Sequence, residues 1–108
     1  MYHVVIAEPA KLDMQIAYDW WAEHRSKEQA DRWYGQIYER LATLGTEAGR
    51  YPRAPDADLH PLGVRQMQFG IGRRPTHCVL FVVDGQEVQV LRVRHVGQAA
   101  LNPDDLGS

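Results

Sequence analysis

Residues 78–95 read CVLFVVDGQEVQVLRVRH, two apolar runs that flank the dipeptide Asp84-Gly85. An Asp-Gly pair between runs rich in valine, leucine and phenylalanine is a strong local signal for a β-hairpin. We therefore predict antiparallel strands over residues 77–83 and 87–96. The second strand also carries two arginines and a histidine near its end. It would present cations and an imidazole on a rigid platform, which suits the binding of phosphate or an acidic partner.

Upstream of this hairpin, residues 64–69 have the composition of a further strand. Three turn-forming residues separate it from the hairpin: Gly70, Gly72 and Pro75. The three strands are therefore expected to form an antiparallel meander. Residues 51–63 contain three prolines and cannot form regular structure, so this segment is expected to be the longest loop.

The N-terminal part of the chain predicts a strand and then a helix. A strand-like run covers residues 2–7, and the following Pro9 is tolerated in the first turn of a helix. Residues 11–25 show helical periodicity. Leu12, Ile16 and Trp20 are spaced four apart, and further apolar residues broaden the same side: Met14, Ala17, Tyr18 and Trp21. We therefore expect a helix with most of its surface covered by other parts of the protein.

A second helix is predicted to follow at once. Ser26 and Gln29 match a capping box, in which the serine oxygen accepts a hydrogen bond from the backbone amide of the third helical residue. Between Ala30 and Ala48 the apolar residues recur with a helical period, and Gly49 closes the helix. They include Trp33, Tyr34, Ile37, Leu41 and Leu44. Because almost nothing separates the two helices, they must form a hairpin.

Two helices with apolar stripes and a sheet with one apolar face can bury each other's apolar surface. We therefore predict an α+β fold of order β-α-α-β-β-β. In this fold the two-helix hairpin packs on one face of a curved, mainly antiparallel four-stranded sheet. At 108 residues, the chain is expected to form a single domain over residues 1–108.

The composition is that of an ordinary globular protein, with 44% hydrophobic and 24% charged residues. No apolar run approaches the roughly 20 residues that span a bilayer, and the N-terminus lacks the pattern of a signal peptide. We therefore expect a cytoplasmic protein without membrane association. The single cysteine, Cys78, excludes an intramolecular disulfide. The five histidines lack metal-ligand spacing, so we expect no metal and no cofactor.

The net charge of −2 hides an uneven distribution. Residues 62–96 carry five arginines against only Asp84 and Glu87. The arginines are Arg65, Arg73, Arg74, Arg92 and Arg94. An acidic protein is a poor general nucleic-acid binder, because non-specific affinity comes from neutralising many phosphates at once. Any phosphate chemistry would therefore be local, and these arginines and His95 are its candidate residues.

The geometry of the last strand leaves two interpretations open. Basic residues near a strand end often only solvate an edge and discourage edge-to-edge pairing. Strand alternation also puts Arg92 and Arg94 on one face and Leu91, Val93 and His95 on the other. The two sets can share a site only if the strand twists or bulges near its end.

Several segments keep a characteristic order within about a hundred residues. They are the opening strand at 2–7, EPAKLDMQIAYDW, ERLATLG, GVRQMQFG, CVLFVVDGQEVQVLRVRH and LNPDDL. In this order and spacing the chain resembles the RelE/ParE family of bacterial toxins, the toxin half of type II toxin–antitoxin pairs. The resemblance implies a small α+β toxin that a partner antitoxin neutralises by wrapping across its surface. It does not choose the target, because RelE-like members cut messenger RNA on the ribosome whereas ParE-like members poison DNA gyrase.

For the RelE-like alternative, the RNA's own 2′-hydroxyl attacks the adjacent phosphate, and no metal is required. The protein supplies an acid, a base and cations. His95 resembles a catalytic histidine of some members, and Arg65 resembles a basic position of strand two. Arg92 or Arg94 would cradle the phosphate. The alternative for His95 is a strand-end histidine bonded to a loop carbonyl.

One departure from the family pattern counts against the RelE-like alternative. Many members of both kinds carry an arginine early in the third strand, which in the ribonucleases stabilises the phosphate, and this chain has Cys78 there. A largely neutral thiol cannot replace a guanidinium, although Arg73 or Arg74 could reach over from the turn. The acidic total charge also suits a ribosome-dependent nuclease poorly. We therefore favour gyrase inhibition, with mRNA cleavage and a degenerate, non-toxic homologue that only binds antitoxin as alternatives.

The resemblance also implies an antitoxin-binding surface. We expect an apolar groove that an amphipathic helix or an added strand fills. An exposed tryptophan among Trp20, Trp21 and Trp33 would mark it, although aromatic residues of the helices more often belong to the core. The oligomeric state is open between a homodimer and a hetero-oligomer with the antitoxin.

Overall fold

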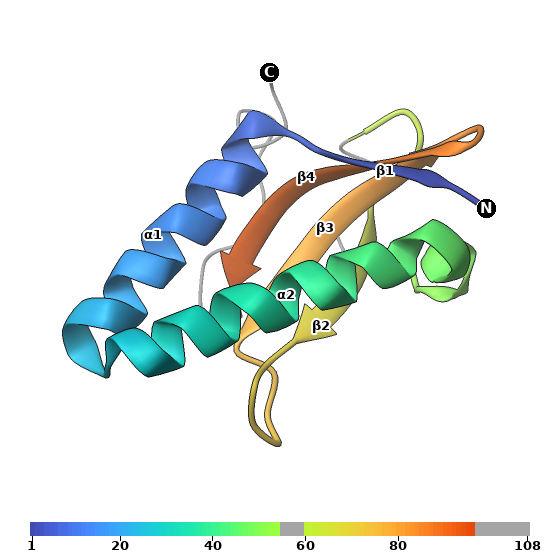
Figure 1. Ribbon diagram of the computed structural model, residues 1–108. Coiled ribbons are helices and arrows are strands. Elements are labelled where there is room, and N and C mark those ends of the chain that lie inside the picture. Colours follow the sequence, from blue (N-terminus) through green and yellow to red (C-terminus); the bar gives the residue numbers. More distant parts are fainter. Residues whose placement is uncertain (55–59, 97–108) are drawn as a thin grey trace.

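The computed structural model describes residues 1–54 and 60–96 (Figure 1). The elements follow in the predicted order: β1 (His3–Ile6), α1 (Glu8–His24), α2 (Lys27–Glu47), a 3₁₀ turn η1 (Ala48–Arg50), β2 (Arg65–Phe69), β3 (His77–Asp84) and β4 (Glu87–His95). The predicted α+β fold is therefore confirmed. Within the described residues, no helix has the length and apolar character needed to cross a membrane.

The four strands form one mixed sheet in the order β1-β4-β3-β2. β2, β3 and β4 are the predicted antiparallel meander, and β1 adds to β4 in parallel at one edge. Asp84 pairs with Glu87, so Gly85 and Gln86 form the hairpin loop. Gly85 has φ of 61°, a left-handed conformation that glycine adopts without steric cost.

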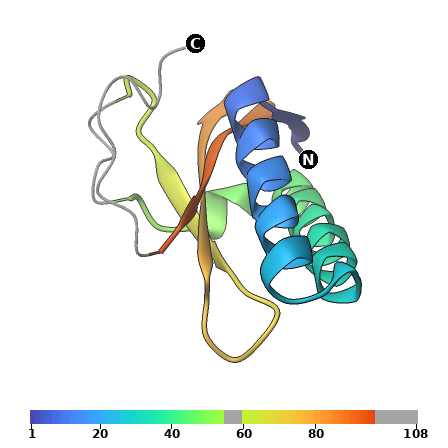
Figure 2. The same cartoon turned by 90° about the vertical axis from the view of Figure 1, so that its left-hand side faces the viewer.

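Both helices cover the same face of the sheet, as Figure 2 shows from the side. α2 begins as predicted, because the Ser26 side chain accepts a hydrogen bond of 3.1 Å from the Gln29 amide. Its apolar face is fully buried against the sheet. The buried residues of this face are Ala30, Trp33, Ile37, Leu41 and Leu44. The helical period in the sequence therefore identified the core face of α2 correctly.

α1 packs differently from the prediction. Its buried residues are Ala10 and Met14, and Ala17 and Trp21 are half-buried against the same core. The residues spaced four apart, in contrast, face away from the core: Leu12 is 60% exposed, Ile16 59% and Trp20 46%. The expectation of a helix covered on most sides was therefore wrong. α1 carries two apolar faces, and the one formed by Ala10, Met14, Ala17 and Trp21 packs on the core.

A β-bulge in β4 decides which residues share a face of the sheet. Leu80 pairs with Arg92 whereas Phe81 pairs with Val90, so Leu91 is the extra residue. Leu91 packs with a small cluster on the face away from the helices, and Val93 packs in the core under the helices. The expectation that Leu91 and Val93 share a face was therefore wrong, because simple alternation ignores the bulge.

Candidate functional site

The site lies where β1 has ended and α1 takes its place beside β4. β1 pairs only with the first part of β4, from Glu87 to Val90. Beyond this point Asp13 of α1 receives the backbone N–H of Val93 at 2.9 Å. The carboxylate thus takes one of the hydrogen bonds that a neighbouring strand would otherwise provide.

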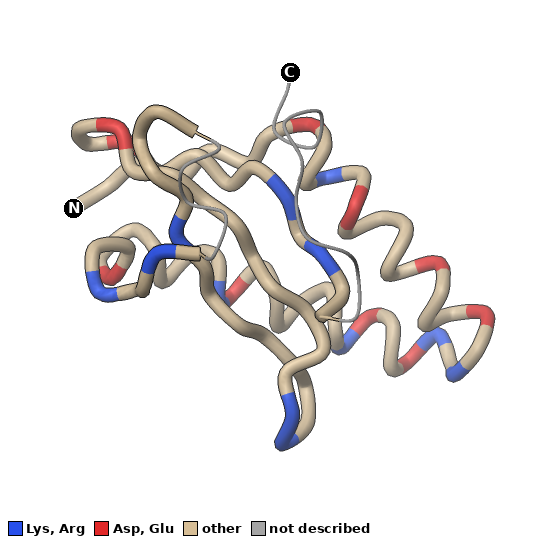
Figure 3. The backbone as a smooth tube through the Cα atoms, turned by 180° about the vertical axis from the view of Figure 1, so that it is seen from behind, with Lys and Arg blue, Asp and Glu red and all other residues tan. Residues whose placement is uncertain are grey.

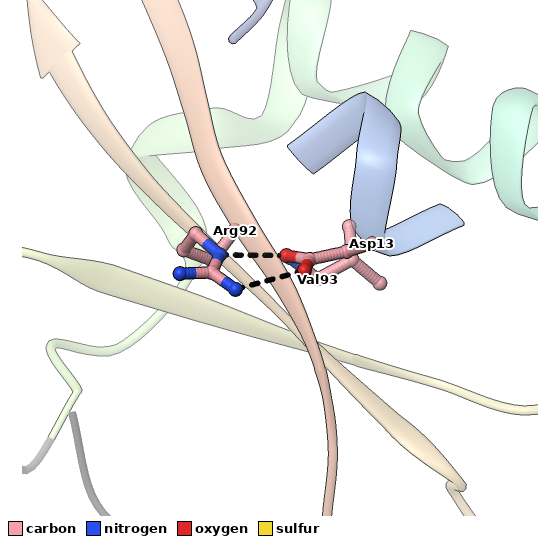
Figure 4. A network of polar contacts seen from close by, with 3 residues as sticks. All are labelled: Asp13, Arg92 and Val93. Atoms are coloured by element: carbon pink, nitrogen blue, oxygen red, sulfur yellow. Dashed lines mark hydrogen bonds and ion pairs between the residues drawn. The ribbon is translucent and has the colours of Figure 1, made fainter. Parts of the chain in front are cut away.

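Asp13 also holds Arg92 in a bidentate ion pair (Figure 4). Nε of Arg92 donates to Oδ2 and Nη2 donates to Oδ1, each at 2.8 Å. Both side chains are largely buried, with 21% of Arg92 and 13% of Asp13 exposed. A paired guanidinium in this geometry fastens α1 to the sheet. Asp13 is not among the candidate residues that the sequence indicates, although a carboxylate between Leu12 and Met14 of an apolar helix is a signal for a buried polar contact.

A groove of about 850 Å³ runs between α1 and the ends of β3 and β4. We call it the α1–β4 groove; its lining residues are Asp13, Ile16, Ala17, Trp20, Trp21, Arg25, Thr76, His77, Arg92, Val93 and His95. One wall is formed by the apolar side chains of α1. The polar lining residues come from several elements: Asp13 from α1, Arg25 from just after it, Thr76 from just before β3, His77 from the start of β3, and Arg92 and His95 from β4. An apolar cleft with a few convergent polar groups is the usual form of a binding site.

The exposed residues Leu12, Ile16 and Trp20, here named the α1 stripe, adjoin this groove, because Ile16 and Trp20 also line it. Trp20 stacks on His24 with ring centroids 4.8 Å apart, and Trp21 meets Trp20 edge-on at 5.6 Å. Trp33 is fully buried in the core beneath α2. Of the three tryptophans predicted for antitoxin binding, only Trp20 and Trp21 are therefore placed to touch a partner.

Two histidines meet at the polar end of the groove. His77 and His95 are register partners on β3 and β4, and their rings lie edge to face at 5.5 Å. His77 is only 7% exposed, and its ring packs on the Trp33 ring with centroids 5.0 Å apart. A hydrogen bond of 2.8 Å joins its Nδ1 atom to the Thr76 hydroxyl. Burial, and then the charge of His95, lowers the pKa of His77 to about 4. His77 is therefore neutral near neutral pH.

Arg65 lies far from His95. Arg65 pairs with Phe81 and His95 pairs with His77, so their partners are separated by about 13 Å along β3. The Arg65 Nη1 atom donates to the backbone oxygen of Tyr51 at 2.6 Å. The structure does not bring the two candidate catalytic residues together.

Of the remaining arginines, Arg94 lies on the face of the sheet away from the helices, and Arg73 and Arg74 lie in the turn between β2 and β3. Arg94 pairs with Cys78, whose thiol donates to Gln66 Oε1 at 3.5 Å. Burial raises the pKa of the Cys78 thiol, which keeps it protonated and neutral. Arg73 and Arg74 are exposed in the turn between β2 and β3, at the tip seen in Figure 3. Over residues 1–54 and 60–96, no cluster of three or more potential metal ligands is present.

Comparison with known proteins places this geometry in a family. No curated protein matches the chain. The fold is similar to a solved structure of the chromosomal ParDE TA system from P. aeruginosa, with a TM-score of 0.71 and 25% sequence identity over 89% of this chain and 97% of that chain. Residues 4–100 match the family described as the ParE toxin of the type II toxin–antitoxin system parDE. The chain therefore belongs to the ParE toxin family of type II toxin–antitoxin systems.

Proposed function

We propose that this toxin blocks DNA gyrase by binding it, without cleaving RNA, and that its antitoxin neutralises it by docking on the α1 stripe and in the α1–β4 groove. The first half of the proposal concerns the target. The second half concerns the partner, and it uses a different surface of the molecule. The two halves can therefore be tested separately.

The observation that carries the first half is that His95 lies far from Arg65 and on the opposite face of the sheet from Arg94, while Arg92, which lines the groove with His95, is held by Asp13. Metal-independent RNA cleavage needs an acid, a base and cations arranged around one phosphate. His95 lies beside His77 on the helix side of the sheet, whereas Arg94 pairs with Cys78 on the other side. The Arg92 guanidinium is engaged by Asp13. This arrangement favours a toxin that acts by contact.

The cationic turn between β2 and β3 is the surface that suits a target. Arg73 and Arg74 are exposed there, in a turn that projects beyond the end of the sheet (Figure 3). Gyrase works on DNA, and a pair of neighbouring guanidinium groups suits contact with phosphates or with acidic side chains. We therefore assign target binding to this turn and to the adjacent end of the sheet.

The observation that carries the second half is the α1 stripe. Soluble proteins rarely leave several large apolar side chains exposed in one row unless a partner covers them. Leu12, Ile16 and Trp20 repeat every helical turn beside the groove, which is the spacing that an amphipathic segment can match. Trp20 is the natural anchor, since tryptophan dominates many interfaces.

The target is tested by induced expression in a bacterial host. Incorporation of labelled thymidine and labelled methionine is followed in one culture over the first minutes. We expect thymidine incorporation to fall first, and we expect His95→Ala to remain toxic. An early fall in methionine incorporation that His95→Ala abolishes would identify a ribonuclease. Unchanged growth with well-folded protein would identify a non-toxic homologue.

Purified protein then tests the assigned surface. We expect the toxin to inhibit plasmid supercoiling by gyrase, and Arg73→Gln with Arg74→Gln to weaken this inhibition. Arg50→Gln is the matched control, because Arg50 is equally exposed but lies on η1, away from the turn. Equal inhibition by all three proteins would contradict the assignment of the turn.

A further inference from the structure

The charges of the α1–β4 groove do not balance within the described residues. Asp13 is its only acidic lining residue, and that carboxylate is engaged by Arg92 and by the Val93 amide. Arg25 lines the same groove at the end of α1, is exposed, and forms no ion pair with any other residue in the described ranges. Over residues 1–54 and 60–96, the groove therefore offers one cation, Arg25, that no acidic side chain balances.

The polar end of the groove is formed by two histidines. His77 lines the groove, and its Nδ1 atom shares a hydrogen bond with the Thr76 hydroxyl. His95, its register partner on β4, lines the same end. Polar groups of an occupant can therefore be accommodated at this end of the groove, whereas its other wall is apolar.

We infer that the antitoxin segment which fills this groove carries an aspartate or glutamate side chain that meets Arg25 at the His77–His95 end, while its apolar side chains cover Ile16, Trp20 and Trp21. The inference rests on the docking proposed above and specifies the chemistry of the docked segment. The α1 stripe gives affinity for any amphipathic segment, whereas the cationic end selects an acidic one.

The groove favours a carboxylate over a phosphate group. One guanidinium balances the single charge of a carboxylate. A phosphate would bring close to two negative charges into a groove that already contains the Asp13 carboxylate. Apolar walls on the α1 side also limit the number of donors that could surround a phosphate. The occupant is therefore a protein segment with an acidic side chain.

The inference is tested with peptides selected by the full-length protein from a random library of amphipathic helical peptides. We expect the selected peptides to carry an acidic residue at a fixed distance from their apolar positions. Selection by Arg25→Glu should remove this acidic residue or replace it with a basic one. Selection by Arg50→Glu, which changes the net charge equally, should keep it.

A double-mutant cycle then isolates the contact. For one selected peptide, we expect replacement of its acidic residue by the amide to weaken binding to the wild-type protein about tenfold, a typical effect of one partly desolvated charge pair. Against Arg25→Gln the same change should have little effect. Independent effects of the two changes would overturn the inference.

The peptides also separate this inference from the docking proposal. Binding that Trp20→Ala abolishes, but that shows no preference for acidic residues, overturns the acidic specificity and leaves docking on the α1 stripe in place. Binding that is insensitive to Trp20→Ala shows that the peptides bind elsewhere, and it overturns both.

Discussion

The two helices of the hairpin use their apolar residues in different ways. In α2, the apolar residues at helical spacing are buried against the sheet, and most of its exposed residues are polar, with Tyr38 at 37% exposure as the exception among the large side chains. In α1, one apolar face packs on the core and a second one, the α1 stripe, faces solvent. A helix that only supports a fold resembles α2. The surplus apolar face of α1 is the feature on which the proposed docking of the antitoxin rests.

The attachment of α1 to the sheet supports the same distinction. α2 is held mainly by a continuous apolar face. α1 is held by fewer buried side chains and by the ion pair between Asp13 and Arg92. A polar anchor leaves the outer face of α1 available for binding while it fixes the position of the helix.

The largest effect is expected from Trp33, the bulkiest fully buried side chain of α2. Trp33→Ala should lower the free energy of unfolding by about 3 to 5 kcal/mol, because it leaves a cavity under Phe69 and His77. Trp33→Phe should cost much less, since the indole N–H forms no hydrogen bond in the described residues. Urea unfolding measures both. A small loss for Trp33→Ala would mean that α2 is not the structural helix.

A pH-dependent effect is expected from His77, on which α2 packs through Trp33. Its pKa in the folded protein is about 4, below the ordinary value of 6.5. As the pH falls, His77 therefore takes up a proton in the unfolded chain before it does so in the folded protein. The free energy of unfolding keeps its full value above pH 6.5 and declines between pH 6.5 and pH 4. The expected decline is about 1 to 3 kcal/mol.

The control for this decline is His77→Leu, which removes the titrating group but keeps an apolar side chain of similar size. Unfolding by urea at several pH values should show a flatter dependence for this variant. If the wild-type protein and His77→Leu lose stability in parallel, the decline comes from other groups. The core beneath α2 would then not contain a histidine that must stay neutral.

Trp33 and His77 also show what the sequence could and could not predict. Trp33 falls on the helical period of α2, and the period alone assigns it to one face. The hairpin loop after Asp84 and the Ser26 cap were predicted for the same reason, because each depends on neighbouring residues only. The proximity of His77 and His95 depends on the register between two strands, and a register follows from the turn length and the bulge together.

The candidate site could be predicted less well, because it depends on how α1 is rotated. Both faces of α1 are apolar, so the helical period alone could not decide whether Met14 or Ile16 belongs to the core. The partner of Arg92 lies 79 residues away in the chain, and no local pattern connects it with Asp13. His95 and the arginines were correctly identified as polar residues near a strand end, but the bulge decides which of them share a face.

The anchor of α1 gives the third prediction. Asp13→Asn should lower the free energy of unfolding by about 2 kcal/mol, because it removes the negative charge that faces the largely buried Arg92 guanidinium and weakens the bond to the Val93 amide. Combining Asp13→Leu with Arg92→Leu should cost less than the sum of the two single changes. Additive losses would show that the ion pair does not fasten α1.

The smallest effect on stability, and the sharpest test of the comparison, is expected from the α1 stripe. Trp20→Ala removes a large side chain that is 46% exposed, so the free energy of unfolding should change by no more than about 0.5 to 1 kcal/mol. Leu62→Ala is the matched control, because Leu62 is 47% exposed and lies outside both helices. Neither change should alter toxicity if the target contacts the turn between β2 and β3.

The two variants should differ in neutralisation. Trp20→Ala should weaken binding to the antitoxin by about 2 kcal/mol, roughly thirtyfold, as expected for an aromatic anchor at the centre of an interface. Leu62→Ala should bind as the wild-type protein does. Titration of antitoxin against each variant measures the difference. If Trp20→Ala destabilises the fold as strongly as Trp33→Ala, the outer face of α1 belongs to the core of the protein, and the distinction between the two helices fails.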